Sequence, residues 1–186
     1  MQLYSWCYRF RSILVTPPLI FASFCFFRET EGFVWPLGIS IFIFGFLLRL
    51  WAQQHLHYRL KIRKQLTTTG PYRFVRNPVY MGNILIGLGA TFVSELVWMV
   101  PITLLWYAIV YRFVVRYEET HLSEKYGEAY QRFKSEVPRW FPRFPRFLKL
   151  ELLNSFFYAS VLKESHCFLI LFPYIVKELF SHGFEL

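Results

Sequence analysis

Two blocks of the sequence combine charged and aromatic residues at spacings that could hold a small charged molecule. The first block is TTTGPYRFVRNPVYMGN, residues 67–83. Pro71 follows a glycine and Pro78 follows an asparagine, and both pairs predict breaks in regular structure. Tyr72 and Tyr80 present ring faces, which attract cations, and hydroxyl groups, which form hydrogen bonds. This block could therefore bind a cationic or polar ligand at the start of a helix.

Gly82 has no side chain at a position where the helix after Pro78 makes its first turn, so another group can approach the backbone there. Arg73 and Arg76 add fixed positive charge. The same composition also suits a basic loop at a membrane surface that uses a glycine for helix packing. The residues by themselves favour neither interpretation.

The second block is IVYRFVVRYEETHLSEKYGEAYQRF, residues 109–133. On a continuous helix, Arg112, Arg116 and Glu119 are spaced i, i+4 and i+7 and lie on one face. Glu118 lies roughly 100° around the helix from Glu119. In one interpretation, Glu119 neutralises an arginine while Glu118 faces a ligand. In the other, these charges form a solvated ion-pair face where the helix leaves the membrane.

The residue types exclude several classes of site. The chain has no aspartate, and its three cysteines lack the spacing of metal or redox motifs. His55 and His57 are two residues apart, which places them on roughly opposite sides of a helix. No glycine-rich phosphate loop, GxSxG sequence or HExxH sequence is present. We therefore predict no metal site.

The composition predicts a bilayer protein. Hydrophobic residues make up 55% of the 186 residues and aromatic residues 22%, which exceeds the usual content of soluble domains. The formal net charge of +9 alternates with long apolar runs. This pattern favours attraction to anionic lipid headgroups over nucleic-acid binding. We predict membrane lipids as partners and no nucleic acid, and the oligomeric state stays open.

Apolar runs predict an all-α integral membrane protein with about four or five membrane helices. Residues 13–27 and 33–51 are the first two predicted spans, and residues 79–115 form a hairpin of two helices interrupted at Ser94-Glu95. A polar helix is expected over residues 116–137, followed by an irregular interfacial segment over 137–147 because three prolines forbid regular helix. Residues 167–176 are either a fifth membrane helix or an interfacial one.

Basic residues concentrate in the N-terminus and in residues 52–78 and 116–149, which predicts that these three regions share the cytoplasmic side. The two blocks would then build a cytoplasmic pocket. We divide the chain into a membrane core, residues 1–149, with motifs over 64–142, and an additional C-terminal membrane or interfacial segment, residues 150–186.

The two blocks together resemble the isoprenylcysteine carboxyl methyltransferase and phospholipid methyltransferase family. That family's pattern is GPYxxxRHPxYxG, a helical hairpin, and EExxLxxxFGxxYxxYxxxVxRxxP. The corresponding stretches are LTTTGPYRFVRNPVYMGN and RYEETHLSEKYGEAYQRFKSEVPRWFP, in the same order. The resemblance implies an enzyme that moves a methyl group from S-adenosylmethionine to a lipid-like acceptor at the cytoplasmic membrane face.

By motif position, the resemblance implies the following S-adenosylmethionine-binding residues: Lys64, Gln65, Leu66, Thr67, Tyr72, Asn77, Pro78, Val79, Tyr80, Gly82 and Glu118. His57 falls where the family places another cofactor contact, although no motif anchors it. The candidate catalytic residues are Arg112, Arg116 and Glu119. In the isoprenylcysteine enzymes an arginine just before the glutamate pair binds the acceptor carboxylate, and Arg112 or Arg116 could serve here.

Asn77 replaces the usual histidine of RHPxY, and an amide forms hydrogen bonds but does not titrate. The chain is also shorter than the eukaryotic isoprenylcysteine enzymes. The predicted acceptor is the carboxylate of a prenylated cysteine-like or other isoprenoid lipid. A phospholipid amine, a sterol-reductase-like reaction with NADPH, and a non-catalytic protein of the same fold are the alternatives.

Overall fold

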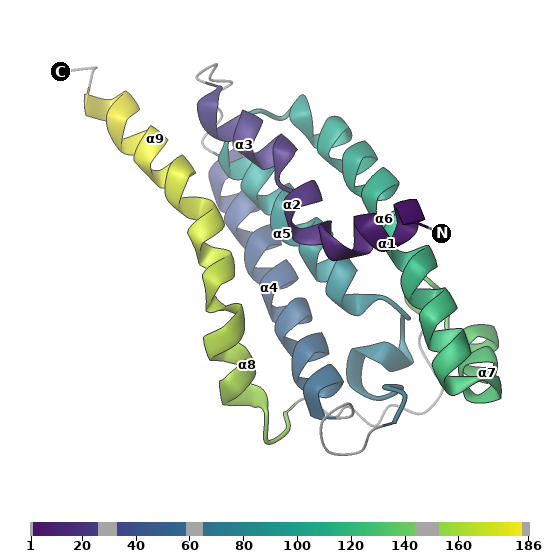
Figure 1. Cartoon of the computed structure of the whole chain (residues 1–186). Helices are drawn as coiled ribbons and strands as arrows, with labels where there is room; N and C mark the ends of the chain where they lie inside the picture. The colour runs from purple at the N-terminus through teal and green to yellow at the C-terminus, as the bar shows by residue number, and fades with distance from the viewer. Residues whose placement is uncertain (1, 26–32, 59–64, 144–152, 184–186) are drawn as a thin grey trace.

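A computed structural model shows a bundle whose longer helices run along roughly one direction (Figure 1). It describes residues 2–25, 33–58, 65–143 and 153–183, and no strand occurs in these ranges. The elements in chain order are α1 (Gln2–Arg9), α2 (Arg11–Leu14), α3 (Pro17–Phe24), α4 (Val34–Tyr58), η2 (Gly70–Arg73), α5 (Pro78–Val93), α6 (Met99–Tyr126), α7 (Glu128–Glu136), α8 (Phe157–Glu164), η3 (Ser165–Leu171) and α9 (Phe172–Gly183).

Three helical stretches of the described chain are long and apolar enough to cross a membrane. They are α4, α6 and the stretch Phe157–Lys177, which joins α8, η3 and the start of α9. α5 is equally apolar but shorter, with 16 residues. Large apolar side chains such as Phe44 on α4 and Leu105 on α6 are more than 60% exposed, as expected for surfaces that face lipid. The prediction of an all-helical fold is confirmed over the described residues, and three candidate spans support the membrane class, whereas the count of four or five membrane helices stays a prediction.

The predicted first span, residues 13–27, is wrong as a single helix. Over its described part the chain forms α2 and then α3, which has eight residues and is about 12 Å long. Pro17 and Pro18 lack backbone N–H groups, so they cannot continue α2, but they fit the first turn of a new helix. Figure 1 shows that α1, α2 and α3 run across the α5 and α6 helices rather than beside them.

The predicted helical hairpin over residues 79–115 is confirmed. α5 ends at Val93, Glu95 has a positive φ of 63°, and α6 begins at Met99. The polar helix predicted to begin at residue 116 is instead the continuation of α6, which stays helical to Tyr126. Gly127, with φ of 52°, breaks the helix before α7, because glycine adopts this conformation at little cost. Residues 137–143 contain no helix, as predicted, and residues 144–147 lie outside the described residues.

α4 and α5 lie against one another with their backbones in direct contact. A Cβ atom added at Gly89 would lie 2.5 Å from the Phe42 backbone nitrogen, and one added at Gly45 would lie 2.8 Å from the Ile86 nitrogen. Gly82 on α5 meets α4 in the same way, near Arg49. Small residues allow this close approach, which membrane helices use in place of a hydrophobic driving force.

The C-terminal segment lies along the other side of α4 (Figure 1). Pro173 lies in the first turn of α9, where a proline costs no hydrogen bond. Arg49 Nε donates to Glu164 Oε2 at 2.5 Å, and the Asn154 backbone N–H donates to Gln54 Oε1 at 3.2 Å. The predicted boundary between residues 149 and 150 lies outside the described residues.

The two basic regions of the sequence meet at one end of the bundle. The Arg76 backbone N–H donates to the Pro138 carbonyl at 2.9 Å, and the Arg143 N–H donates to the Phe74 carbonyl at 3.0 Å. η2 and α7 lie at this same end in Figure 1. The tertiary structure therefore places the two sequence blocks side by side.

Candidate functional site

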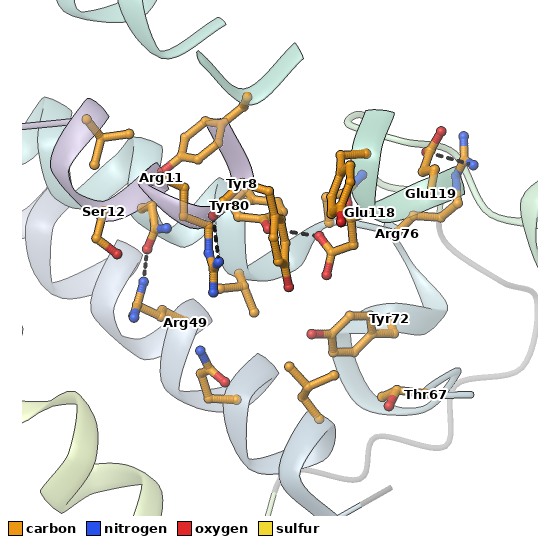
Figure 2. A pocket seen from close by; sticks show the side chains of 18 of the residues that line it. Tyr8, Arg11, Ser12, Arg49, Thr67, Tyr72, Arg76, Tyr80, Glu118 and Glu119 are labelled. Atoms are coloured by element: carbon orange, nitrogen blue, oxygen red, sulfur yellow. Dashed lines mark hydrogen bonds and ion pairs between the residues drawn. The ribbon is translucent and has the colours of Figure 1, made fainter. Parts of the chain in front are cut away.

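A cavity of about 760 Å³ opens between the two sequence blocks and continues into the helix bundle. Its lining comes from α1, α2 and α3, from α4, α5 and α6, from the segment around η2, from α7 and from η3. Figure 2 shows side chains from several of these elements pointing toward a shared space. Cavities of several hundred Å³ are typical of small-molecule sites.

The η2 turn presents Tyr72 to this cavity. Gly70 has a φ of 60°, and a Cβ atom added there would lie 2.5 Å from the ring of His55 on α4. His55 Nδ1 lies 3.2 Å from the hydroxyl of Thr69, so the turn is bound to the end of α4. Burial and the negative charge of Glu118 raise the pKa of the Tyr72 hydroxyl above its usual range. Tyr72 therefore stays protonated and can donate a hydrogen bond at neutral pH.

Tyr80 on α5 and Glu118 on α6 form the centre of the site. The Tyr80 hydroxyl donates to Glu118 Oε2 at 2.8 Å, as the dashed line in Figure 2 shows. Both side chains line the cavity. The carboxylate of Glu118 keeps further acceptor positions, because each ionised carboxylate offers about four lone-pair directions. It can therefore bind a ligand amine while Tyr80 holds it in place.

Glu119 forms ion pairs with two arginines instead. Arg76 Nη1 lies 3.0 Å from Glu119 Oε1, while Arg139 donates from Nε at 3.0 Å and from Nη2 at 2.5 Å. Glu119 is only 7% exposed. It thus connects α6 to the chain before α5 and to the chain after α7. The two neighbouring carboxylates therefore have different partners: Glu118 binds Tyr80, and Glu119 binds two arginines.

Asn77 is buried at the N-terminus of α5 and lines the cavity. Its Nδ2 donates to the Arg139 carbonyl at 3.2 Å. An amide does not titrate, so it donates this hydrogen bond without taking up a proton. The residue that replaces the family's histidine therefore links the two sequence blocks.

The structure brings eight of the predicted residues into the cavity lining. They are Leu66, Thr67, Tyr72, Asn77, Val79, Tyr80, Glu118 and Glu119. Lys64 lies outside the described residues. Among the described residues, Gln65, Pro78, Gly82 and His57 do not contribute to this lining. Gly82 is covered by α4, and His57 Nε2 lies 3.3 Å from Lys163 Nζ.

The two predicted acceptor arginines face away from the cavity. Arg112 and Arg116 are exposed on α6, and Arg116 lines a separate shallow hollow with Tyr4 and Tyr117. Arg112, Arg116 and Glu119 share one face of α6, as predicted. Of these three residues, α7 and the chain around Arg139 bury only Glu119. The arginines that line the cavity are Arg11, Arg49 and Arg76.

Sequence reasoning missed two groups of lining residues. The first group comes from the N-terminal helices, where Arg11 Nη1 donates to the Tyr8 carbonyl at 2.8 Å and its guanidinium lies 4.4 Å from the Tyr8 ring centre. The second comes from η3, with Cys167 and Ile170. Neither region carries a recognisable motif, so no local signal could have found them. Arg49 lies near the end of the predicted span over residues 33–51, and nothing in its local sequence indicates that it faces a cavity.

The lining changes from polar to apolar along α6. It begins with Lys125 and Tyr126 at the end near η2 and reaches Tyr107 in the bundle, about 28 Å away along the helix axis. Gly87 lies against the Tyr107 ring, and the lining also includes its neighbour Ile86 and Ile170, which packs in the same apolar cluster as Ile86. The cavity can therefore hold a polar molecule at one end and an apolar chain at the other.

Two buried hydroxyl groups in the polar part have no hydrogen-bond partner among the described residues. They belong to Thr67 and Tyr126, and both residues line the cavity. Buried polar atoms are almost always hydrogen-bonded in folded proteins. Together with the acceptor positions of Glu118, these hydroxyls suit a ligand rich in hydroxyl, amino and carboxylate groups.

Comparison with known families decides the assignment. A family model described as Phospholipid methyltransferase matches residues 34–129, from the start of α4 to the start of α7. The chain belongs to the phospholipid methyltransferase family. The resemblance predicted from the two blocks is thereby confirmed, and the matched region begins one helix earlier than the motifs do.

Two curated relatives share about a third of their aligned residues with this chain. The nickel-cobalt-cadmium resistance protein NccN of Alcaligenes xylosoxydans xylosoxydans is 33% identical over 60% of this chain and 49% of its own. The cobalt-zinc-cadmium resistance protein CzcN of Cupriavidus metallidurans is 32% identical over 58% of this chain and 47% of its own. The chain thus spans about half the length of these relatives, and no solved structure matches it.

Proposed function

We propose that this protein transfers a methyl group from S-adenosylmethionine to a lipid-like acceptor at the cytoplasmic membrane interface. The observation that carries the proposal is the single cavity that unites both family blocks and changes from polar to apolar along its length. A polar cofactor would enter the end near η2 and α7, while an apolar tail would enter between the helices. A polar reactant can meet a lipid only where water and bilayer meet.

The polar end of the cavity offers a suitable set of partners for the cofactor. Glu118 would bind its amino group, and the unpaired hydroxyls of Thr67 and Tyr126 would bind its remaining polar groups. The cofactor supplies a methyl group on a sulfonium cation. The ring faces of Tyr72 and Tyr80 would stabilise that positive charge, since aromatic faces attract cations.

The chain itself has little covalent chemistry to perform. Its residues orient the donor and the acceptor in line and exclude water, which together account for large rate accelerations. Glu119 contributes by positioning, because its ion pairs with Arg76 and Arg139 hold the two blocks together. Glu119 is in this proposal a positioning residue rather than one that touches the reactants.

The acceptor head group would meet the arginines that line the cavity rather than Arg112 or Arg116. Arg11 is the first choice, because its guanidinium lies beside Tyr8 and is not paired with a carboxylate among the described contacts. Arg49 already pairs with Glu164. A planar guanidinium can hold a carboxylate through two parallel hydrogen bonds. This favours a carboxylate acceptor, such as that of a prenylated cysteine-like lipid, over a phospholipid amine.

Binding measurements on purified protein in detergent test the core of the proposal. We expect calorimetric titration to show binding of S-adenosylmethionine and none of NADPH. Binding of NADPH alone would support a reductase, and binding of neither would indicate a non-catalytic protein of this fold. Transfer of radiolabel from the cofactor to total membrane lipid should then identify the acceptor class by alkaline lability, because methyl esters are hydrolysed and methylamines are not.

The arginine assignment has a matched pair of variants. Arg11→Lys keeps the positive charge but loses the planar fork, so it should lower transfer to a carboxylate acceptor while leaving cofactor binding intact. Arg112→Lys makes the same change on the exposed face of α6 and should leave transfer unchanged. Loss of transfer in Arg112→Lys alone would restore the role that the sequence predicted for Arg112.

The orientation of the site in the membrane is tested by labelling. A cysteine at Lys134, on exposed α7, should react with an impermeant maleimide only in inverted vesicles or lysed cells. A cysteine at Val97, between α5 and α6 at the other end of the bundle, should react in intact cells. The reverse pattern would place the cavity mouth on the outer face.

A further inference from the structure

We propose that Glu164, His166 and Cys167 form a binding site for a tetrahedral divalent transition-metal ion of the zinc class. One ligand atom of each side chain lies within 4.8 Å of the ligand atoms of the other two. The chain changes here from α8 to the 3-10 helix η3. A 3-10 helix has three residues per turn, so residues 164 and 167 are brought onto one face.

His166 makes a backbone hydrogen bond of the kind that positions metal-bound histidines. Its Nδ1 lies 2.6 Å from the Lys163 carbonyl oxygen. A carbonyl can only accept a hydrogen bond, so Nδ1 donates to it, and in the neutral ring the free lone pair then lies on Nε2. Histidine ligands of metals commonly donate their other ring N–H to a backbone carbonyl in this manner.

Glu164 and Cys167 complete the set from the buried side. Glu164 is 1% exposed, and Arg49 binds only its Oε2 atom, which leaves Oε1 for a second partner. The hydrogen bond from Arg49 also fixes the direction of the carboxylate, as groups around metal ligands do. Cys167 is a buried free thiol, and its thiolate would neutralise part of the metal charge.

The donor set selects the type of metal. A thiolate, an imidazole and a carboxylate suit Zn²⁺ and similar ions, whereas Mg²⁺ and Ca²⁺ require oxygen ligands. His166 and Cys167 also line the large cavity, so a fourth, open coordination position would face it. The cluster lies outside residues 34–129, so this site is a property of the C-terminal segment and does not depend on the methyl-transfer proposal.

Cobalt titration of the full chain in detergent tests the site. After treatment with a chelator and desalting, we expect Co²⁺ to bind in a single equivalent. It should produce thiolate-to-cobalt charge-transfer absorption and the intense visible bands of a tetrahedral ion. Zn²⁺ should displace it and excess Mg²⁺ should not. Absence of the charge-transfer band in the wild-type protein would overturn the proposal.

Two variants with matched controls assign the ligands. Cys167→Ser should abolish the charge-transfer band, whereas Cys25→Ser, at another free cysteine, should keep it. His166→Ala removes an exposed side chain, so folding is not at risk, and it should weaken Co²⁺ binding at least about tenfold. His121→Ala, which removes a histidine side chain that is exposed on α6, is the control for this variant. Unchanged affinity in His166→Ala, or a band lost in Cys25→Ser, would overturn the assignment.

Discussion

α4 contacts two neighbours, and the two contacts are built in different ways. Toward α5 the backbones touch at glycines, with Gly38 and Gly45 on one helix and Gly82 and Gly89 on the other. Toward the C-terminal segment, long polar side chains bridge the helices, as in the pair formed by Arg49 and Glu164. The first contact requires glycines that have no side chain of their own, whereas the second requires long polar side chains.

The two kinds of contact also differ in whether they lie within the residues that the family model matches. The close-packed pair lies within the matched residues 34–129, and the C-terminal segment lies outside them. Dispersion between touching backbones needs no particular partner residue beyond a glycine, so it can form a common scaffold. A buried ion pair needs two complementary residues far apart in sequence. One wall of the cavity is therefore a packed scaffold and the other is attached to it by specific polar contacts.

The largest expected effect is on the packed contact. Gly89→Leu would force a side chain against the Phe42 backbone, because even a Cβ atom at Gly89 would lie only 2.5 Å from the Phe42 nitrogen. Overpacking of this kind should cost more than about 3 kcal/mol of stability. We expect little monodisperse protein in detergent by size-exclusion chromatography. Ala108→Leu, on the exposed face of α6, is the control and should behave as wild type.

Loss of the ion pair should have a smaller and more local effect. Glu164→Gln leaves Arg49 without its charged partner, which should cost roughly 3 kcal/mol, the lower end for broken buried pairs. We expect limited proteolysis to release the C-terminal segment while α4 and α5 stay protected. Glu128→Gln, in the exposed pair with Arg132, should change nothing. Global unfolding of Glu164→Gln would mean that both contacts belong to one cooperative unit.

The neighbouring carboxylates on α6 divide ligand binding from stability. Glu118→Gln should remove a charged hydrogen bond to the cofactor worth about 1.5–3 kcal/mol, roughly tenfold or more in S-adenosylmethionine affinity. Glu119→Gln should lower the unfolding temperature more and the affinity less, because Glu119 pairs with Arg76 and Arg139. Calorimetry and thermal unfolding of both variants measure this. Equal or reversed affinity losses would show that the assignment is wrong.

The smallest effect concerns the apolar part of the cavity wall that η3 of the C-terminal segment forms. Ile170→Ala enlarges the cavity where an acceptor tail would lie, and we expect a loss of about 1 kcal/mol in acceptor binding. KM for the acceptor should rise about fivefold while cofactor affinity stays constant. Leu169→Ala, at a neighbouring residue that is 71% exposed, is the control. A changed cofactor affinity in Ile170→Ala would place the cofactor, rather than the acceptor, against η3.

The sequence by itself determined the helical membrane class, the hairpin of α5 and α6, and the family. Each of these depends on local information: apolar runs set the helices, and Pro78 marks where α5 begins. It also predicted Tyr72, Tyr80 and Glu118 for the cofactor site, and all three line the cavity. Their roles stay predictions until the variants are measured.

Only the tertiary structure decided which charges face the cavity. Arg112 and Glu119 are seven residues apart and differ by only about 20° around α6, yet the first is exposed and the second buried. The reason is that burial of a helix face changes along its axis, according to which later segment covers it. Arg11, Arg49 and Cys167 entered the site in the same way, through contacts between segments far apart in the chain. Helical periodicity fixes the direction of a side chain around its own axis, whereas the packing of the other helices determines what that side chain meets.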